Sequence, residues 1–592
     1  MSEPFEDSRR LTGANLYFDA AGAALEIAPG VPFDAGTLQC WRGNIARVRA
    51  ALDWPDGAVF VREHASGASL AFAAPLDQLY TATEANEWAL YAALGLRADD
   101  TPVDEHAEHS RPHVAHFDGE EALRQLRVLA DAEAKPAVLA LIDAAHAHGV
   151  PAHVDDEALS IGEGETSQTW AVDTLPDADA VSWPRLRGVP KAVVTGSNGK
   201  TTTVRLLAAM LRAHGLACGY SSTDGLFIDG ERIEAGDYSG PVGARTVLRH
   251  PRVQAAVLET ARGGLLRRGL VADDARTAIV TNVSVDHFGE YGVHALDDLA
   301  AVKLVVAKSL AAGGMLVLNA DDAMLVKHAA ATHAPRFGWF AQEFDAALAR
   351  GTDACGVRDG RLMLAVDGIE HDLGDITGMP LTIAGSARYN IANIAAASLA
   401  ASALGIAPAT IVGVLARFGA SNADNPGRLQ RWSLGDVEVL LDYAHNPDGL
   451  RGLLDVAAGL RRGGRLALLL GHAGNRLEAD FHALAAVAAD ARPDRVWLKD
   501  IGGDYLRGRA SGEVAAILFG ALRAAGLPAE ALPTCLDEAE ATREALQWAR
   551  AGDLLVLPIH EPARRDVVVA LLDRLQAAGW RAGDPLPAAG AA

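Results

Sequence analysis

Val193–Leu207 reads VVTGSNGKTTTVRLL, and this stretch decides the fold that the rest of the chain has to support. An apolar strand is expected to end at Thr195, glycines follow, and a helix is expected to begin near Lys200. A standard phosphate-binding loop reads G-x-x-x-x-G-K-[ST]. Here the leading glycine is Gly196, so the loop is shorter than the standard one. The predicted nucleotide-binding residues are Gly196, Ser197, Asn198, Gly199, Lys200, Thr201 and Thr202.

Each part of this loop has a physical role toward a nucleotide. Backbone N–H groups of the loop and the positive end of the following helix face an anion. Lys200 is expected to reach the β- and γ-phosphates, and the Thr201 hydroxyl is expected to ligate Mg²⁺. A chance glycine-rich turn is the alternative. The order of strand, glycines, Lys-Thr and helix favours nucleotide binding.

The overall charge limits the classes of partner. The chain has 592 residues, 50% of them hydrophobic, and a formal net charge of −23. The length suggests three or four domains. The negative charge argues against broad nucleic-acid binding and against docking on an anionic membrane, because both need a basic surface. We therefore expect neither a nucleic-acid partner nor a membrane partner.

Cysteine usage and the apolar runs indicate a cytoplasmic chain. Cys40, Cys218, Cys355 and Cys535 have no paired spacing, as expected for a reduced protein without a disulfide framework. The first residues lack the apolar segment of a signal peptide. The longest near-apolar run, residues 391–416, is alanine-rich and contains Pro408. It predicts two soluble helices rather than a membrane span.

Two polar breaks, near residues 187 and 425, divide the chain into the expected domains 1–187, 188–425 and 426–592. In the middle domain, short apolar runs alternate with helical patterns, which predicts a doubly wound parallel sheet. The last domain repeats the pattern and is expected to be a smaller α/β domain. An N-terminal α+β domain completes the predicted α/β architecture.

The loop, in the form T-G-[ST]-N-G-K-T-T, resembles that of the Mur ligase family, a family of ATP-dependent amide ligases. Further motifs follow in family order. AAVLETARGG places Glu259 where the family keeps a Mg²⁺-binding glutamate, and TNVSVDHFGEYG supplies His287 as a second Mg²⁺ ligand. AAVKLVV places Lys303 where many members carry a carbamylated lysine, although an exposed surface lysine is an equal alternative. The resemblance thus implies ATP and Mg²⁺ as cofactors and Lys200, Glu259, His287 and Lys303 as catalytic residues.

The family motifs continue toward the C-terminus. GSARYNIANIAAA places Asn390 and Asn393 near an adenine, NPGR supplies Arg428 for the phosphates, and LDYAHNP supplies Asp442 for a ribose. The resemblance further implies substrate contacts from four residues: Arg262, His445, Asn446 and Arg507. Arg262, Arg267 and Arg268 are candidates for holding an anionic substrate, and ordinary surface charge is the equal alternative. Two departures, Asn475 in place of an aspartate and Arg268 in place of a glutamate, concern substrate identity.

Within this family, the stretch around ETARGG and the segment RGRASGE resemble the Mur-like ligase part of cyanophycin synthetases. That resemblance implies addition of an amino acid such as arginine to an aspartate side chain, with an amino acid and an aspartyl peptide as partners. LSIGEGETSQTW resembles a fragment of an ATP-grasp region, so a shortened relative is expected. The alternatives are a simple kinase, a ligase for another peptide acceptor, and a non-catalytic ATP-binding partner of a full-length synthetase. The oligomeric state stays open, a homo-oligomer included.

Overall fold

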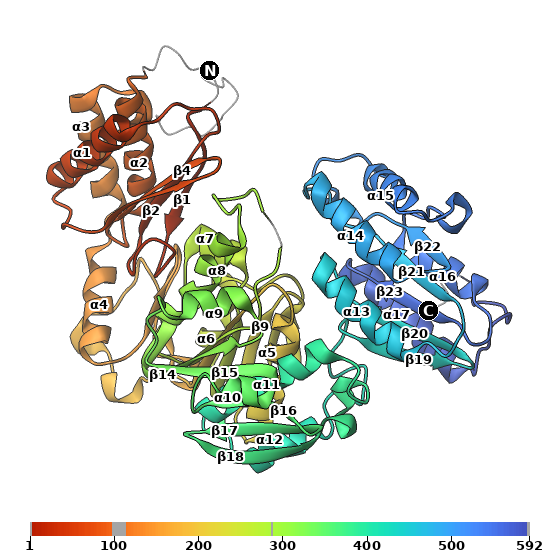
Figure 1. The fold of residues 1–592 in the computed structure, drawn as a ribbon. Coiled ribbons are helices and arrows are strands. Elements are labelled where there is room, and N and C mark those ends of the chain that lie inside the picture. Colours follow the sequence, from red (N-terminus) through yellow and green to blue (C-terminus); the bar gives the residue numbers. More distant parts are fainter. Residues whose placement is uncertain (1–2, 97–113, 286–287, 589–592) are drawn as a thin grey trace. The chain divides into compact units, whose positions relative to one another are not determined.

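The computed structural model describes residues 3–96, 114–285 and 288–588 (Figure 1). The chain divides into two compact units. The first unit comprises Met1–Gly356, Leu364–His371 and Ala395–Ile411. The second comprises Val357–Met363, Asp372–Ile394 and Val412–Ala592.

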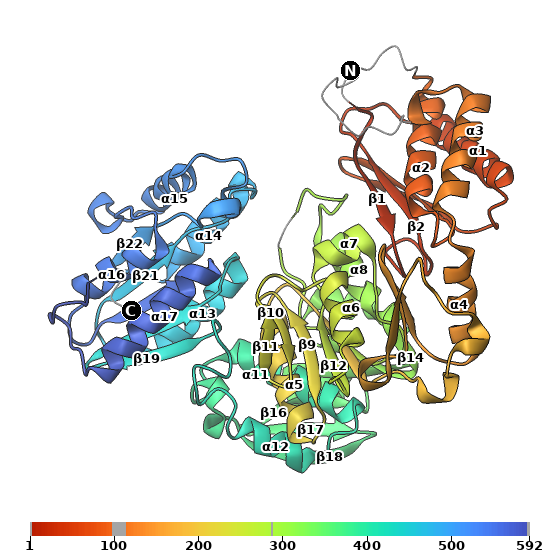
Figure 2. The ribbon, with the colours of Figure 1, turned by 180° about the vertical axis from the view of Figure 1, so that it is seen from behind.

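The first unit begins with an antiparallel four-stranded sheet in the order β1-β2-β4-β3. Its helices lie together on one face of this sheet (Figures 1 and 2). Trp41, Trp88 and Phe72 are fully buried between the two layers. Antiparallel sheets bury one face in this way. The elements are β1 (Phe5–Leu11), β2 (Gly22–Ile27), β3 (Val59–His64), β4 (Gly67–Ala73), α1 (Ala35–Leu52), α2 (Leu79–Leu94) and α3 (Gly119–Glu133).

A small three-stranded antiparallel sheet follows, with its own helix. Its elements are α4 (Pro136–Ala147), β5 (Ala152–Val154), β6 (Ala158–Ile161) and β7 (Gln168–Ala171). Buried charges anchor it to the start of the next sheet. The Lys191 amine donates to both carboxylate oxygens of Glu163, at 2.7 and 2.8 Å, and His153 lies 2.8 Å from the same carboxylate. Glu163, in the LSIGEGETSQTW segment, therefore has structural contacts.

The largest sheet has eleven strands in the order β11-β10-β9-β12-β8-β13-β14-β15-β16-β17-β18. The strands from β9 to β15 in this order are parallel and β10 and β11 add an antiparallel edge. The bounds are β8 (Lys191–Thr195), β9 (Cys218–Ser222), β10 (Gly225–Ile228), β11 (Glu231–Glu234), β12 (Ala255–Glu259), β13 (Ala275–Val280), β14 (Leu310–Asn319), β15 (Arg336–Glu343), β16 (Ala354–Arg358), β17 (Arg361–Val366) and β18 (Ile369–Asp375).

The strand order creates a switch point at β8. After β8 the chain adds β9 on one side, inserts β12 between the two, and then crosses to β13 on the other side. In open α/β sheets, ligands bind beyond the carboxyl ends of the strands at such a point. The predicted phosphate loop follows β8 directly. The doubly wound parallel sheet is thus confirmed, and its central strand is the one that leads into the loop.

Helices flank the strands of this eleven-stranded sheet (Figures 1 and 2). They are α5 (Lys200–Ala213), α6 (Pro241–Arg249), α7 (Arg262–Arg268), α8 (Leu296–Leu304), α9 (Ala323–Ala329), α10 (Phe344–Leu348), α11 (Arg388–Ala403) and α12 (Pro408–Leu415). The alanine-rich run forms α11 and α12, as predicted, with Pro408 opening the second helix. Within the described ranges, no helix is long and apolar enough to cross a membrane.

The second unit contains a five-stranded sheet in the order β19-β20-β23-β21-β22, in which only β19 is antiparallel. Separate apolar cores cover its two faces, which confirms the predicted smaller α/β fold. The bounds are β19 (Gln430–Leu434), β20 (Val437–Asp442), β21 (Leu466–Leu470), β22 (Arg495–Leu498), β23 (Leu554–Pro558), α13 (Pro447–Leu460), α14 (Glu478–Asp490), α15 (Glu513–Ala524), α16 (Glu538–Trp548) and α17 (Pro562–Ala577).

Candidate active site

The loop between β8 and α5 is held in shape by the segment that follows β13. The Ser197 hydroxyl donates to the Ser284 carbonyl at 3.0 Å, and the Thr281 hydroxyl donates to the Asn198 carbonyl at 2.6 Å. The Asn198 amide donates to the side-chain oxygen of Asn282 at 2.9 Å. A loop fixed by so many bonds is preorganised to present its backbone to an anion.

Two positions of this loop require glycine. Gly199 has a φ of 84°, in the left-handed region, immediately before helix α5 begins at Lys200. Gly196 has a φ of 147°, and a Cβ there would lie 1.8 Å from the Thr281 hydroxyl oxygen. Any side chain at Gly196 would therefore push the loop away from the strand end. The close approach explains why the shortened loop keeps its leading glycine.

Lys200 folds back over the loop that precedes it. Its Nζ donates to the carbonyl oxygens of Gly196 and Ser197, at 3.0 and 3.2 Å. The amine thus lies beside the N-terminus of α5, where backbone N–H groups carry a partial positive charge. The two features together favour a phosphate ligand at this position.

A buried carboxylate lies next to the loop, with two hydroxyl partners. Glu259, at the end of β12, is 1% exposed. One of its oxygens accepts from the Thr201 hydroxyl at 3.0 Å, and the other accepts from the Thr223 hydroxyl at 3.1 Å. The two hydroxyl oxygens are 3.2 Å apart. Thr223, which follows β9, was not predicted from the sequence.

This group of oxygens fits Mg²⁺. Magnesium takes oxygen ligands and is usually held by one or two carboxylates, with water and substrate phosphates completing its shell. Glu259 and Thr201 supply a carboxylate and a hydroxyl at the phosphate loop. Among the described residues, no group of three or more His, Cys, Asp and Glu side chains could hold a metal. The predicted ligand His287 lies outside the described residues.

Two further predicted residues of the first unit are buried. Arg262, the first residue of α7, forms an ion pair with Glu290, and its side chain is 9% exposed. Lys303 lies in α8 and is 3% exposed. The interpretation of Lys303 as an exposed surface lysine is therefore wrong. Its carbamylation stays a prediction.

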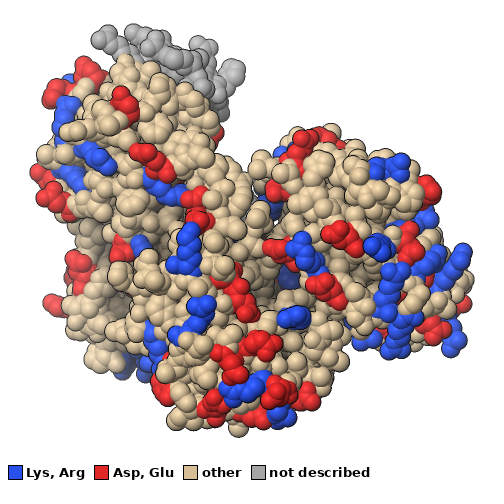
Figure 3. Space-filling view, viewed as in Figure 1, with Lys and Arg blue, Asp and Glu red and all other residues tan. Residues whose placement is uncertain are grey.

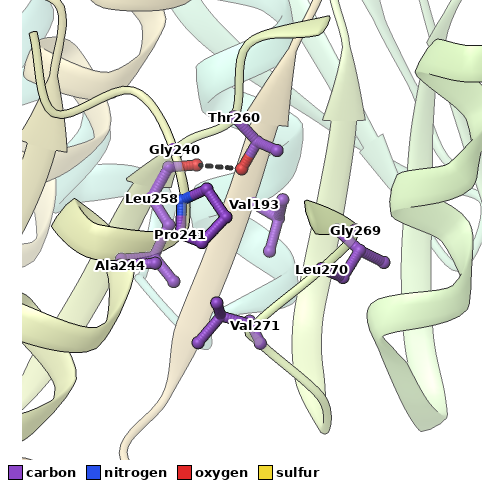
Figure 4. A pocket seen from close by; sticks show the side chains of 10 residues that line it. Val193, Gly240, Pro241, Ala244, Leu258, Thr260, Gly269, Leu270 and Val271 are labelled. Atoms are coloured by element: carbon purple, nitrogen blue, oxygen red, sulfur yellow. Dashed lines mark hydrogen bonds between the residues drawn. The ribbon is translucent and has the colours of Figure 1, made fainter. Parts of the chain in front are cut away.

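A small pocket beside this site has a different character. It lies between β8, β12, the start of α6 and the segment after α7, and it is lined mainly by apolar side chains such as Pro241, Leu258 and Val271 (Figure 4). None of the predicted site residues lines it. Its lining offers no charged group to a nucleotide, so the phosphate loop remains the candidate site.

In the second unit, Asp442 is the last residue of strand β20, and its side chain is hydrogen-bonded to the residue that follows the NPGR segment. Its Oδ2 accepts from the Leu429 amide at 2.7 Å. Burial raises the pKa of the Asp442 carboxyl, and the nearby Arg428 guanidinium partly opposes that rise. The Arg428 guanidinium itself lies over the Tyr443 ring, 4.4 Å from its centroid, in a cation–π contact. The two predicted nucleotide-binding residues Arg428 and Asp442 are thus neighbours.

Four of the other predicted residues of this unit make local hydrogen bonds, and the fifth, Arg507, is exposed. The Asn446 side chain caps α13 by accepting from the Gly449 amide at 2.8 Å, and His445 Nδ1 lies 3.3 Å from the Tyr443 carbonyl. In α11, the Asn393 amide donates to the Asn390 side chain at 3.2 Å, and Asn390 donates to the Leu381 carbonyl at 3.0 Å. Arg507 is exposed, with its guanidinium 5.9 Å from the Tyr505 ring centroid.

A buried polar network in the second unit was not predicted from the sequence. Lys499, Glu538 and His560 are at most 2% exposed. The Lys499 amine donates to Glu538 and lies 3.1 Å from His560 Nδ1, while His560 Nε2 lies 3.0 Å from the Ala444 carbonyl. Burial, then the Lys499 charge, lowers the pKa of His560 to about 4. A neutral His560 therefore donates from Nε2 to the loop that follows Asp442. Lys499 and His560 each follow the end of a strand, which was the available signal.

A parallel sheet with a phosphate loop at its switch point and an acidic group beside it defines a nucleotide-binding α/β protein. Residues 194–401 match the Mur ligase middle domain, and residues 427–558 match the Mur ligase, glutamate ligase domain. These two matches together span more than half of the chain, and the chain belongs to the Mur ligase family.

Individual relatives differ in how much of their length is matched. The chain is 36% identical to cyanophycin synthetase from Trichormus variabilis over 62% of this chain and 41% of that protein. It is 29% identical to UDP-N-acetylmuramoyl-L-alanyl-D-glutamate–2,6-diaminopimelate ligase from Chlorobaculum tepidum, over 62% of this chain and 70% of that one. The solved structure of E. coli FolC in complex with DHPP and ADP is similar with a TM-score of 0.49 and 20% identity, over 65% of this chain and 89% of that chain. The chain therefore spans about two fifths of the length of the cyanophycin synthetases it matches.

Proposed function

We propose that this chain is an ATP-dependent, ADP-forming ligase that joins a carboxylate to an amine through an acyl phosphate. The observation that carries the proposal is the buried Glu259 carboxylate, held by the Thr201 and Thr223 hydroxyls beside the phosphate loop. The names of the relatives, a synthetase and a ligase, support the same class of reaction.

The proposed reaction has two steps. An oxygen of the acceptor carboxylate bonds to the γ-phosphorus of ATP, the bond from that phosphorus to the β,γ-bridging oxygen breaks, and ADP leaves. The amine then attacks the acyl carbon, inorganic phosphate leaves, and the amine nitrogen loses a proton to solvent. Activation is needed because the charge of a free carboxylate repels a nucleophile and its oxygen leaves poorly. Enzymes catalyse such phosphoryl transfers mainly by positioning and by electrostatic stabilisation.

The residues of the first unit supply these effects. The Lys200 amine, together with the N-terminus of α5, offsets the negative charge of the phosphates. Thr201 and Glu259 would hold Mg²⁺, which when bound neutralises phosphate charge. His287 as a second metal ligand and Lys303 as a carbamylated residue remain part of the proposal. In the second unit, Asn390, Asn393, Arg428 and Asp442 are proposed to contact the nucleotide.

For the substrates, we propose an amino acid such as arginine as the amine and an aspartate side chain as the acceptor. The identity to cyanophycin synthetases supports this assignment. Substrate contacts are proposed for Arg262, His445, Asn446 and Arg507. Arg262 follows Glu259 by three residues, and its side chain is buried in an ion pair with Glu290; both facts support its proposed place beside the phosphate loop.

Release of ADP that depends on both substrates tests this function. The purified chain is incubated with ATP and Mg²⁺ and screened over amino acids and short aspartyl peptides. A ligase releases ADP only when an acceptor and an amine are both present, whereas a kinase needs no amine and a non-catalytic ATP-binding protein releases none. Hydroxylamine in place of the amino acid is expected to give a hydroxamate. Ligation without any hydroxamate would count against a free acyl phosphate.

A further inference from the structure

An arginine cluster lies in the first unit where three segments meet. Strand β1 contributes Arg10, helix α6 contributes Arg245 and Arg249, and the end of α7 contributes Arg268. The Arg268 carbonyl accepts from the Thr12 amide at 2.8 Å, which fixes β1 against α7. The turn between β5 and β6 adds two carboxylates, Asp155 and Asp156. Figure 3 shows one face of the molecule, on which acidic and basic side chains are interspersed.

One arginine and one aspartate of this cluster have a structural role. Arg249 donates to the Asp155 carboxylate, to the Ser160 hydroxyl at 2.9 Å, and to the carbonyls of His153 and Ala158, both at 3.0 Å. The other oxygen of Asp155 accepts from the amides of Glu157 and Ala158. Arg249 and Asp155 therefore hold the β5–β6 turn against α6, and each neutralises the charge of the other.

Arg245 and Arg268 have much weaker compensation. The nearest carboxylate oxygen to Arg245 is the Asp155 oxygen that Arg249 already occupies, and it lies 3.5 Å away. Arg268 donates to two backbone carbonyls, those of Arg10 at 3.4 Å and Arg267 at 3.0 Å. Within the described part of the chain, neither guanidinium has a carboxylate of its own. The Arg245 side chain is nonetheless only 14% exposed.

The third guanidinium of the cluster, that of Arg10, is held in place by Asp156 and Tyr80. Arg10 pairs with Asp156 at 2.9 and 3.4 Å and lies over the Tyr80 ring, 3.6 Å from its centroid. The Asp156 side chain is 66% exposed, so solvent or a ligand can compete for this pair. Burial lowers the pKa of Arg245 and of Arg268, and the Arg10 charge lowers that of Arg268 further. Positive charge is thus concentrated at this junction in a chain whose net charge is −23.

We propose that Arg10, Arg245 and Arg268 form a binding site for a carboxylate-rich peptide. A guanidinium presents a planar fork of N–H donors that matches a carboxylate in two parallel hydrogen bonds. Several forks around one junction suit a ligand with several carboxylates, which also replaces the missing counter-charge.

The site is connected to the candidate active site by helix α7. Arg262 begins this seven-residue helix, three residues after Glu259, and Arg268 ends it. A helix of this length spans roughly 10 Å. An extended peptide covers that distance in about three residues. We therefore assign the ligand as the acidic acceptor peptide, with one carboxylate at the phosphate loop and others at the arginine cluster; this assignment rests on the proposed function.

Direct binding tests the site without any reaction. Tetra-aspartate is titrated into the full chain without ATP, by calorimetry, at low and at physiological salt. Arg245→Gln and Arg268→Gln are each expected to weaken binding about tenfold or more, because each removes a charge-assisted pair. Arg212→Gln is the matched control. It removes the same charge from an exposed arginine of the same unit that pairs with Asp229, and it is expected to leave the affinity unchanged.

Asp156→Asn separates a ligand site from a purely structural network. Removal of this carboxylate frees Arg10, so tetra-aspartate is expected to bind several-fold more tightly. A structural network would instead lose stability without gaining affinity. Thermal unfolding of each variant shows that it is folded. The proposal is overturned if tetra-aspartate does not bind, if the arginine variants bind like the control, or if inorganic phosphate binds as tightly as the peptide.

These experiments distinguish a failure of the proposed binding site from a failure of the proposed ligase function. Lys200→Ala is expected to lose ATP turnover while it keeps most of the tetra-aspartate affinity, because the carboxylates at the arginine cluster do not contact the loop. Binding without ADP release by the parent chain would refute the ligase and leave the site. ADP release with full acceptor affinity in Arg268→Gln would refute the site and leave the ligase.

Discussion

At the scale of single residues, the site brings a cationic group and an acidic group to the same loop. Lys200 lies over the loop carbonyls, and Glu259 is buried behind Thr201. A negatively charged nucleotide would contact the lysine directly, whereas the glutamate needs a cation between itself and the phosphates. The two residues therefore support the same chemistry through different contacts, and their substitutions should have different signatures.

Lys200→Ala is expected to lower kcat/KM for ATP by a factor of about 10² to 10³, the size of effect seen when one electrostatic contact to developing charge is lost. The protein should remain folded, because Lys200 is only partly buried and bonds to its own loop. ADP release and thermal unfolding measure the two effects. A variant that unfolds would mean that the loop is misassigned.

Glu259→Gln tests the metal assignment. Glutamine keeps the size of the side chain and can still bond to both threonines, with its NH2 group donating to one hydroxyl, but it removes the charge that a divalent cation requires. We expect ATP turnover to fall by about 10² or more, and the Mg²⁺ concentration for half-maximal rate to rise. Thr223→Ser, which keeps the hydroxyl, is the control and should change both little. An unchanged Mg²⁺ dependence in Glu259→Gln would refute the assignment.

At the scale of elements, strand ends position the functional groups. Local patterns predicted the strand, loop and helix around Gly196, since each depends on a few adjacent residues. Thr223 escaped prediction because its contact with Glu259 requires that β9 and β12 be neighbours, and strand order is not a local property. The Lys499–Glu538–His560 network escaped for the same reason. The burial of Lys303 depends on how α8 packs, and the short residue pattern around it did not decide this.

The buried Lys499–Glu538–His560 network predicts that the stability of the second unit depends on pH. The pKa of His560 is about 4 in the folded protein, against 6.5 as its ordinary value. Between these values the unfolded chain binds a proton that the folded one excludes, so stability falls as the pH drops from 6.5 to 4. The loss from this group is on the order of 3 kcal/mol. Burial opposes the ionisation of Glu538, but Lys499 and His560 lower its pKa overall. Stability therefore falls further as the pH drops below 4.5, the ordinary pKa of a glutamate.

Hydrogen exchange of the β20 and β23 amides, corrected for intrinsic pH dependence, measures this effect within the full chain. His560→Gln is the control, because glutamine does not titrate and its amide can both donate and accept. Protection in the variant should be lower at neutral pH and nearly flat between pH 6.5 and 4.5. An equal slope in parent and variant would assign the pH dependence to other groups.

At the scale of the whole molecule, the described residues contain one phosphate loop with a carboxylate beside it. The segment before β8 is tied down by the Glu163–Lys191 ion pair, which gives LSIGEGETSQTW a structural role. An enzyme with one site for activating a carboxylate forms one kind of bond.

With ATP, arginine and aspartyl peptides, we expect at most one added amino acid per side-chain carboxylate and no lengthening of the peptide backbone. Mass spectrometry of the products, with fragmentation to locate the new amide, measures this directly. Tetra-aspartate with its side chains converted to amides is the matched control acceptor and should accept nothing on them. Backbone-extended products from the purified chain would show a second activating site and defeat the one-site interpretation.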